Sequence, residues 1–124
     1  MRNDDSVVLE VVYGDVAMLL TGDISAEIER AILPQLTRSR IRILKVAHHG
    51  SRTSTSQELL DAWRPQVALI SCGRGNPFGH PAPEVVSRLA AAGARIYRTD
   101  RDGEITVDTD GERVVVRTFA GDGR

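Results

Sequence analysis

Short apolar runs rich in β-branched residues alternate with segments of helical spacing along most of the chain. The first two runs, Val7–Val12 and Val16–Thr21, flank the turn residues Tyr13-Gly14-Asp15, a pattern that predicts a β-hairpin. Further strands are expected at Ile41–Ala47, Val67–Ser71, Ala94–Arg98, Glu104–Asp108 and Arg113–Thr118.

Three segments between these runs have the features of helices. Residues 26–36 place apolar side chains on one face, although Pro34 must kink or shorten the helix. Residues 57–63 predict a short helix that one of the preceding serines or threonines caps. Residues 83–92 begin with a proline and end before Gly93, which suits a left-handed helix cap.

The order of elements is therefore a hairpin, three helix–strand pairs and a closing hairpin. The alternation in the middle predicts an α/β fold with helices on one face of a layered sheet, and the terminal hairpins make that sheet mixed. With 124 residues, 41% hydrophobic and 27% charged, the chain has the material for one domain over residues 1–124, without linker or repeat.

Composition excludes several classes of protein. Sixteen basic against seventeen acidic side chains exclude a polybasic nucleic-acid binder, so any anion must be held by local groups. The single cysteine, Cys72, excludes a disulfide framework and a multi-cysteine zinc site. No apolar run is long enough to cross a bilayer, and the first residues lack the core of a signal peptide. We therefore expect a soluble chain that does not itself insert into a membrane.

Polar, glycine-flanked residues follow the expected strands or lie in a loop at three places. These are Thr21-Gly22-Asp23, residues 48–51 and Gly79-His80-Pro81, and the last two contain every histidine of the chain. Asp23 with two imidazoles would form a carboxylate–histidine set suited to zinc, manganese or iron. Consecutive side chains in an extended chain point to opposite faces, so only one of His48 and His49 should reach a given metal.

Ordinary structural roles compete with each of these interpretations. Asp23 fits a helix-capping or turn aspartate equally well, and the histidine pair fits the end of a strand. His80, before a proline, is more often a plain loop residue. Cys72 fits a small buried side chain better than a nucleophile. Arg52 and Arg74 lie in the same loops and could bind phosphate oxygens, which is weak evidence in an arginine-rich chain.

Four stretches of sequence resemble one family, in a motif order that related phosphodiesterases and phosphorylcholine esterases of the same superfamily share. They are NDDSVVL at the start, LLTGDI at Leu19–Ile24, LKVAHHGSRTSTS at Leu44–Ser56 and NPFGHPAPEVVSRLAAAGARIYRTDRDGEITV at Asn76–Val107. They resemble the metallo-β-lactamase-like domain of ComEC-family competence proteins, which are membrane proteins implicated in DNA uptake during transformation. The resemblance covers roughly residues 3–118. It implies the C-terminal half of a four-layer αββα sandwich that lies outside the membrane spans of its parent.

The resemblance also implies roles for individual residues. Asp23 corresponds to the aspartate that bridges two metal ions, zinc or manganese, and one histidine of the pair, for which we favour His49, is a metal ligand. The implied parent activity is hydrolysis of a phosphodiester, with single-stranded DNA as the expected substrate. The other predicted site residues lie beside the metals: His48 and His80 join Asp23 in the catalytic set, and Ser51, Arg52 and Arg74 contact the substrate.

The sequence departs from the family in one respect. The family's metal site also uses an earlier H-x-H/D-x-D-H cluster, whereas His48 is the first histidine here. We therefore expect the missing N-terminal half to be a partner of this chain. The isolated chain should bind metal weakly or not at all, show little activity, and self-associate through an uncovered sheet face. Two alternatives stay open: a non-catalytic α/β binding or assembly module, and a fragment of a small-molecule phosphoester hydrolase.

Overall fold

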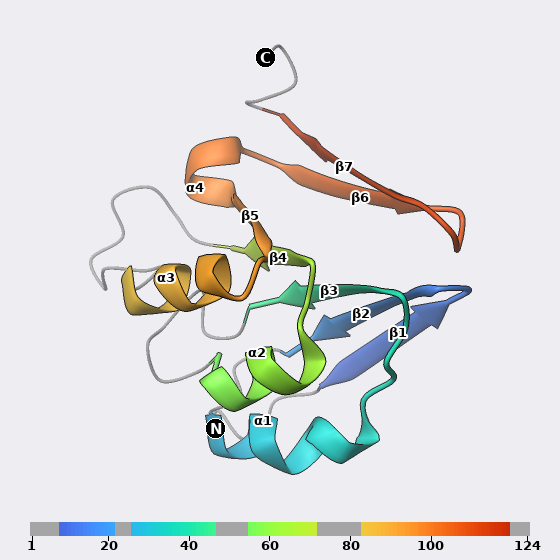
Figure 1. The fold of residues 1–124 in the computed structure, drawn as a ribbon. Helices are drawn as coiled ribbons and strands as arrows, with labels where there is room; N and C mark the ends of the chain where they lie inside the picture. The colour runs from blue at the N-terminus through green and yellow to red at the C-terminus, as the bar shows by residue number, and fades with distance from the viewer. Residues whose placement is uncertain (1–7, 22–25, 47–54, 72–82, 120–124) are drawn as a thin grey trace.

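Seven strands in the described part of the chain form two separate sheets. The computed structural model describes residues 8–21, 26–46, 55–71 and 83–119 (Figure 1). The larger sheet has the order β1-β2-β3-β4-β5, and the smaller one pairs β6 with β7. The strands are β1 (Leu9–Tyr13), β2 (Val16–Leu20), β3 (Ile41–Lys45), β4 (Val67–Ile70), β5 (Arg95–Arg98), β6 (Ile105–Thr109) and β7 (Val114–Thr118).

The larger sheet is mixed, as the sequence predicts, but only the first hairpin belongs to it, because the closing hairpin of β6 and β7 forms a sheet of its own. β1 and β2 form an antiparallel hairpin closed at the pair Tyr13–Val16, whereas β2, β3, β4 and β5 run parallel to one another. Each parallel strand is added beside the previous one, so the chain crosses the sheet in a single direction. Crossover connections of this kind are almost always right-handed, and a single direction of travel therefore places the intervening helices on one face.

The helices of the described residues are short and end where local chemistry predicts. Their bounds are α1 (Ala26–Ile32), the 3-10 turn η2 (Leu33–Gln35), α2 (Gln57–Trp63), α3 (Pro83–Ala91) and α4 (Thr99–Asp102). Pro34 shortens the first helix as expected, because the regular α-helix stops at Ile32. The Ser56 side chain accepts a hydrogen bond from the Leu59 amide and caps α2. Gly93 has the expected positive φ, +86°.

One helix and several strand limits differ from the sequence-based expectation. α4 lies between the strands expected at Ala94–Arg98 and Glu104–Asp108, where the sequence pattern predicts no helix. β1 begins at Leu9 and reaches Tyr13, and β3 ends at Lys45 rather than Ala47. Apolar runs continue past the residues that form ladder hydrogen bonds, which is why hydrophobic pattern alone misplaces strand ends.

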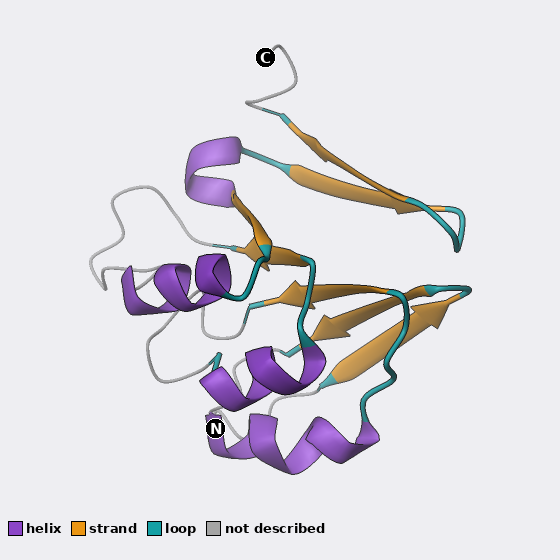
Figure 2. Cartoon of the chain, in the orientation of Figure 1, coloured by secondary structure: helices purple, strands orange, loops and turns teal. Residues whose placement is uncertain are grey.

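The main core lies between the parallel strands and the helices (Figure 2). Alternate residues of the central strands turn one face toward the helices, and each fully buried large side chain there contributes roughly 1.5–3 kcal/mol. The buried cluster consists of Ala17, Leu19, Leu44, Val46, Ala68 and Ile70 from the strands and their ends, with Leu59, Leu60, Trp63, Val85 and Leu89 from α2 and α3. This core fixes the strand ends that carry the candidate site.

The hairpin of β6 and β7 touches the larger sheet through its tip. Gly14, at φ +57°, lies so close to Gly111 that a Cβ on Gly14 would come within 2.4 Å of the Gly111 carbonyl oxygen. The Asp15 amide donates a hydrogen bond of 2.6 Å to the same oxygen. Only glycine tolerates this combination of positive φ and close approach, so Gly14 fixes where the second hairpin docks.

None of the helices in the described part of the chain combines the length and apolar character needed to span a bilayer.

Candidate functional site

The carboxyl ends of the parallel strands lie side by side at one edge of the larger sheet. The last ladder pairs join Leu20 to Lys45 and Lys45 to Leu69, so β2, β3 and β4 end at the same level. We call the residues that follow these ends, Thr21, Val46 and Ser71, the carboxyl edge. In α/β sheets, ligands bind outside the carboxyl ends of the parallel strands, because the connections to the following helices meet there.

Every site residue predicted from the sequence follows one of these three strand ends. Asp23 lies in residues 22–25, which follow β2; His48, His49, Ser51 and Arg52 lie in residues 47–54, which follow β3; and Arg74 and His80 lie in residues 72–82, which follow β4. All seven positions lie outside the described residues, as does Cys72, and their side-chain roles stay predictions. The described strands bring the starts of the three segments together at one edge.

Thr21 ties the first two strand ends to each other. Its side chain is fully buried, and its hydroxyl donates a hydrogen bond of 2.6 Å to the carbonyl oxygen of Lys45. Beyond that point, the Val46 amide donates to the carbonyl of Leu69 over 2.9 Å. Contact between neighbouring strands therefore continues past the last regular ladder pair, up to the residues where segments 22–25 and 47–54 begin.

Glu29 ties the far ends of the same two segments. Its side chain, on α1, is only 1% exposed, and its two oxygens accept hydrogen bonds of 2.6 Å from the Thr55 amide and 2.7 Å from the Ser56 amide. A buried carboxyl group is costly unless it is hydrogen-bonded, and these amides satisfy both of its oxygens. Glu29 thus joins the helix that follows segment 22–25 to the residues that follow segment 47–54.

Thr55 has an unfavourable conformation at the point where segment 47–54 ends. Its φ of +57° is in the left-handed region, which β-branched residues rarely adopt. Its side chain is 1% exposed, and its hydroxyl has no hydrogen-bond partner among the described residues. Such a backbone conformation costs of order 1–3 kcal/mol and persists only where surrounding contacts impose it. The two amide bonds to Glu29 are contacts of this kind.

The fourth parallel strand ends in a charged cluster that sequence reasoning did not single out. Arg98 pairs with Ile70 in the ladder, which places it beside the end of β4. Its guanidinium forms two hydrogen bonds with Asp100, of 3.0 and 2.8 Å, and its amide donates to the buried carboxylate of Asp102 over 2.8 Å. A bidentate arginine–carboxylate pair has a fixed geometry, so this cluster holds the turn into α4 rigidly.

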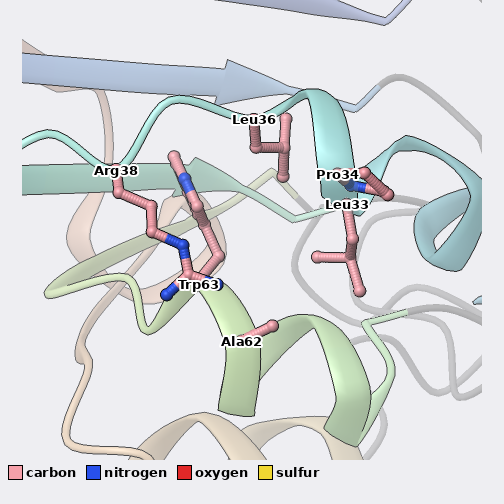
Figure 3. Close-up of a pocket in the computed structure, with 6 residues that line it drawn as sticks. All are labelled: Leu33, Pro34, Leu36, Arg38, Ala62 and Trp63. Atoms are coloured by element: carbon pink, nitrogen blue, oxygen red, sulfur yellow. The ribbon is translucent and has the colours of Figure 1, made fainter.

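A pocket of about 250 Å³ lies elsewhere, between η2 and the last turn of α2 (Figure 3). Trp63, in its wall, donates its indole N–H to the carbonyl of Thr37 and accepts at its own carbonyl from Arg42, near the start of β3. The pocket is lined by Leu33, Pro34, Leu36, Arg38, Ala62 and Trp63. It therefore lies toward the amino ends of the strands, away from the predicted site residues.

Within the ranges that the structure describes, no three His, Cys, Asp or Glu side chains gather closely enough to hold a metal ion. The residues that the sequence proposes as ligands, Asp23 and His49, are outside those ranges. Their donor set, a carboxylate oxygen and an imidazole nitrogen, fits zinc or manganese by its chemistry.

Thr21 enters the sequence-based candidates only within the group Thr21-Gly22-Asp23, without a role of its own, and Glu29 is not among those candidates. Glu29 lies in the first turn of α1, where a carboxylate also suits the helix dipole. Its spacing carried a further signal, because Glu29, Leu33 and Leu36 follow one helical face, and both leucines pack against the core. A glutamate on the apolar face of a helix indicates a buried acceptor with a specific partner.

The described fold places the chain in the general class of α/β domains, which bind ligands at the carboxyl edge of the sheet.

In sequence, the chain is similar to proteins named for competence and recombination. It is 36% identical over 104 residues to ComE operon protein 3 of Bacillus subtilis, covering 84% of this chain and 13% of that protein. It is 38% identical over 115 residues to Recombination protein 2 of Haemophilus influenzae, covering 93% and 14%. It is 36% identical over 104 residues to Competence protein ComA of Neisseria gonorrhoeae, covering 83% and 15%.

The chain therefore spans only a small part of the length of these relatives, 13%, 14% and 15% respectively. No protein-family signature matches it, and no solved structure matches it.

Proposed function

We propose that the chain is the C-terminal part of a metal-dependent phosphodiesterase domain that acts on DNA during uptake by competent cells. Three relatives with names that refer to competence or recombination support the biological setting, at 36% to 38% identity over most of this chain. The resemblance of its motifs to the metallo-β-lactamase-like domain of ComEC-family proteins supports the reaction. The parent of such a domain is a membrane protein, with this domain outside the spans.

The common edge of β2, β3 and β4 is the observation that carries the proposal. A hydrolytic centre needs groups from distant parts of the sequence held close together. The ladder pairs at Leu20, Lys45 and Leu69 place the origins of the three segments next to one another. The segments that carry Asp23, the histidine pair and His80 therefore start at adjacent points of the sheet, which supports the proposal that these residues serve one centre.

Asp23 and His49 would hold the metal ions, zinc or manganese. When bound, such ions supply a Lewis acid and a hydroxide nucleophile at neutral pH. His48 and His80 would orient groups beside them, and Ser51, Arg52 and Arg74 would contact a phosphate. Because the net charge is −1, a DNA strand would be held by these local groups and not by the overall field of the chain.

The edge strand β1 supports the proposal of a second half as partner. Leu9, Val11 and Tyr13 pair with alternate residues of β2 on the sheet face that is turned away from the helical core, and they are 51%, 47% and 57% exposed. Neighbouring apolar side chains exposed to this degree are typical of a protein-interaction surface. We propose that the N-terminal half of the domain covers these side chains. In the isolated chain, a second copy would cover them instead.

The test joins this chain to a proximal half that carries the H-x-H/D-x-D-H cluster. Metal content and cleavage are measured on single-stranded DNA and on a small phosphodiester, for the joined domain and for the 124-residue chain. The joined domain should bind metal tightly and cleave DNA. Asp23→Ala should abolish its turnover, and Cys72→Ala, the control, should leave turnover unchanged.

Each other result has a defined meaning. Robust cleavage by the short chain alone would contradict the need for a second half. Cleavage of the small phosphodiester without DNA cleavage would favour a small-molecule hydrolase. A joined domain with neither metal nor activity would favour the binding or assembly module, and full activity in Asp23→Ala would contradict the ligand assignment.

A further inference from the structure

Two segments that carry predicted metal ligands are bounded on both sides by described residues. Segment 22–25, with Asp23, leaves Thr21 and enters α1. Segment 47–54, with His49, leaves Val46 and ends at Thr55, just before α2. The relative placement of the two segments therefore depends on the contacts between Thr21 and β3 and on the contacts between α1 and Thr55.

The starts of the two segments are joined by a side chain of the sheet. The Thr21 hydroxyl donates to the Lys45 carbonyl over 2.6 Å in a fully buried position. The ladder of β2 and β3 would by itself hold the strands only as far as the pair Leu20–Lys45. The threonine extends this hold by one residue, to the point where segment 22–25 begins.

The ends of the two segments are joined by Glu29. From α1, its carboxylate accepts the amides of Thr55 and Ser56 at 2.6 and 2.7 Å, at a side chain that is 1% exposed. Few apolar contacts of the core connect α1 directly to this point, because the buried cluster draws its helical members from α2 and α3. Arg30 of α1 also pairs with Glu58 of α2 over 3.0 Å, but both side chains are about half exposed, and exposed ion pairs contribute little. The Glu29 carboxylate is therefore the buried polar link between α1 and the residues that begin α2.

We infer that Glu29 is a positioning residue of the site, one that sets where the segment of His49 lies relative to the segment of Asp23. This inference rests on the proposed function, in which both residues serve one metal centre. Metal ligands tolerate only small displacements, and residues that orient them typically change affinity by 10–100-fold when mutated. Threonine rarely adopts the positive φ that Thr55 has, so this backbone conformation agrees with one imposed by the hydrogen bonds to Glu29.

The experiment compares Glu29→Gln with the unchanged sequence, each within the joined domain described above, in three measurements. Amide hydrogen exchange at Thr55 and Ser56, without metal, reports the two hydrogen bonds. Titration with Mn²⁺ alone reports the site, at a temperature where thermal unfolding shows both proteins to be folded. Glutamine keeps the shape but offers one acceptor oxygen in place of two. We expect faster exchange at both amides and Mn²⁺ affinity lower by about tenfold.

A matched control is Glu10→Gln. Glu10 also accepts two hydrogen bonds, from the amide and the hydroxyl of Thr37, at 2.8 and 3.0 Å, but it holds the loop after η2 and not a site segment. Its substitution should leave Mn²⁺ affinity within twofold of the unchanged chain. If Glu29→Gln fails to fold, Glu29→Asp keeps the charge and shortens the reach, and it should lower affinity in the same direction.

Two negative results are distinguishable. Mn²⁺ binding that Glu29→Gln or Glu29→Asp leaves unchanged, with exchange at Thr55 and Ser56 accelerated, would overturn the positioning role and leave the proposed function standing. A joined domain of unchanged sequence that binds no Mn²⁺ at millimolar concentration would contradict the metal site itself, and this inference with it.

Discussion

The two edges of the parallel strands differ in their contacts. At the amino edge, where β3 and β4 begin, side chains hold the connections through hydrogen bonds to the backbone. At the carboxyl edge, the strands lead into the segments that carry every predicted site residue. Arg42 shows the first arrangement, with its guanidinium donating to the carbonyls of Ser39, Trp63 and Arg64. Gln66 adds to it, since its amide group donates to the Arg40 carbonyl and accepts from the Arg42 amide.

The tip of the second hairpin closes the amino edge further. Gly111 contacts Gly14, and the Asp15 carbonyl accepts from the amide of Ile41, the first residue of β3. At the carboxyl edge, Thr21 and Glu29 instead connect the ends of segments 22–25 and 47–54, which carry the predicted ligands Asp23 and His49. Under the proposed function, the amino edge serves stability and the carboxyl edge serves the site, and the following predictions test that division.

The largest effect is expected for Arg42→Ala at the amino edge. The substitution leaves several backbone carbonyls at the ends of α2 and β3 without their charged donor, and the free energy of unfolding should fall by about 2–4 kcal/mol. Mn²⁺ affinity of the folded protein should stay within twofold. Chemical denaturation and metal titration measure the two quantities. A loss of Mn²⁺ affinity greater than tenfold in Arg42→Ala would show that the amino edge also determines metal binding, contrary to the proposed division.

Gly14→Ala should have the next largest effect. The added Cβ would meet the Gly111 carbonyl oxygen at 2.4 Å and would require positive φ, +57°, from alanine. We expect a loss of about 1–3 kcal/mol, with amide shifts concentrated in β6, β7 and the β1–β2 turn. Shift changes centred on Thr21 or Val46 would show instead that the two edges are coupled.

Thr21→Val tests the carboxyl edge with a smaller cost in stability. The change keeps the shape and removes the hydroxyl that donates to the Lys45 carbonyl, so the free energy of unfolding should fall by about 1 kcal/mol. Mn²⁺ affinity should nevertheless fall severalfold. Arg42→Ala, which lowers the free energy of unfolding more, should leave that affinity within twofold. Equal Mn²⁺ affinities in Thr21→Val and the unchanged chain would show that Thr21 does not support the site.

The smallest effect concerns Asp110 in the β6–β7 turn. Hydrogen bonds from the amides of Arg113 and Glu112 hold the pKa of its carboxyl below the ordinary value of 3.8. A lowered folded-state pKa contributes stability above the unfolded value, and this contribution is lost as pH falls through the lowered pKa. An NMR titration of the carboxyl carbon should therefore show a midpoint below 3.8 and little change in Thr21. A midpoint at or above 3.8 would contradict the hydrogen bonds.

Much of the fold could be predicted from sequence because its elements obey local rules. The turn chemistry of Gly14, the cap of α2 and the interruption at Pro34 all acted as expected. The mixed character of the sheet also followed from the order of elements. Strand order did not follow directly, since periodicity identifies a strand but not its neighbour.

For the candidate site, the sequence predicts residue types, which stay predictions, but it does not predict the contacts that support the strand ends. Glycine-flanked aspartate and histidine residues at strand ends have a local signature. Glu29 and the Arg98–Asp100 pair do not, because their roles depend on partners brought close only by the fold. The α4 turn was missed for the same reason, since the carboxylate of Asp102 bonds to the Arg98 amide and converts an apparent loop into a helix.

Paramagnetic broadening by Mn²⁺ tests most directly the claim that chemistry belongs to the carboxyl edge. The ion is added in small steps to the ¹⁵N-labelled chain, and the loss of each amide signal is followed. The account predicts that Thr21, Val46 and Ser71 broaden first, while Ile41 and Gln66 at the amino edge persist. Earlier loss of Ile41 and Gln66, or uniform broadening of all five amides, would contradict it.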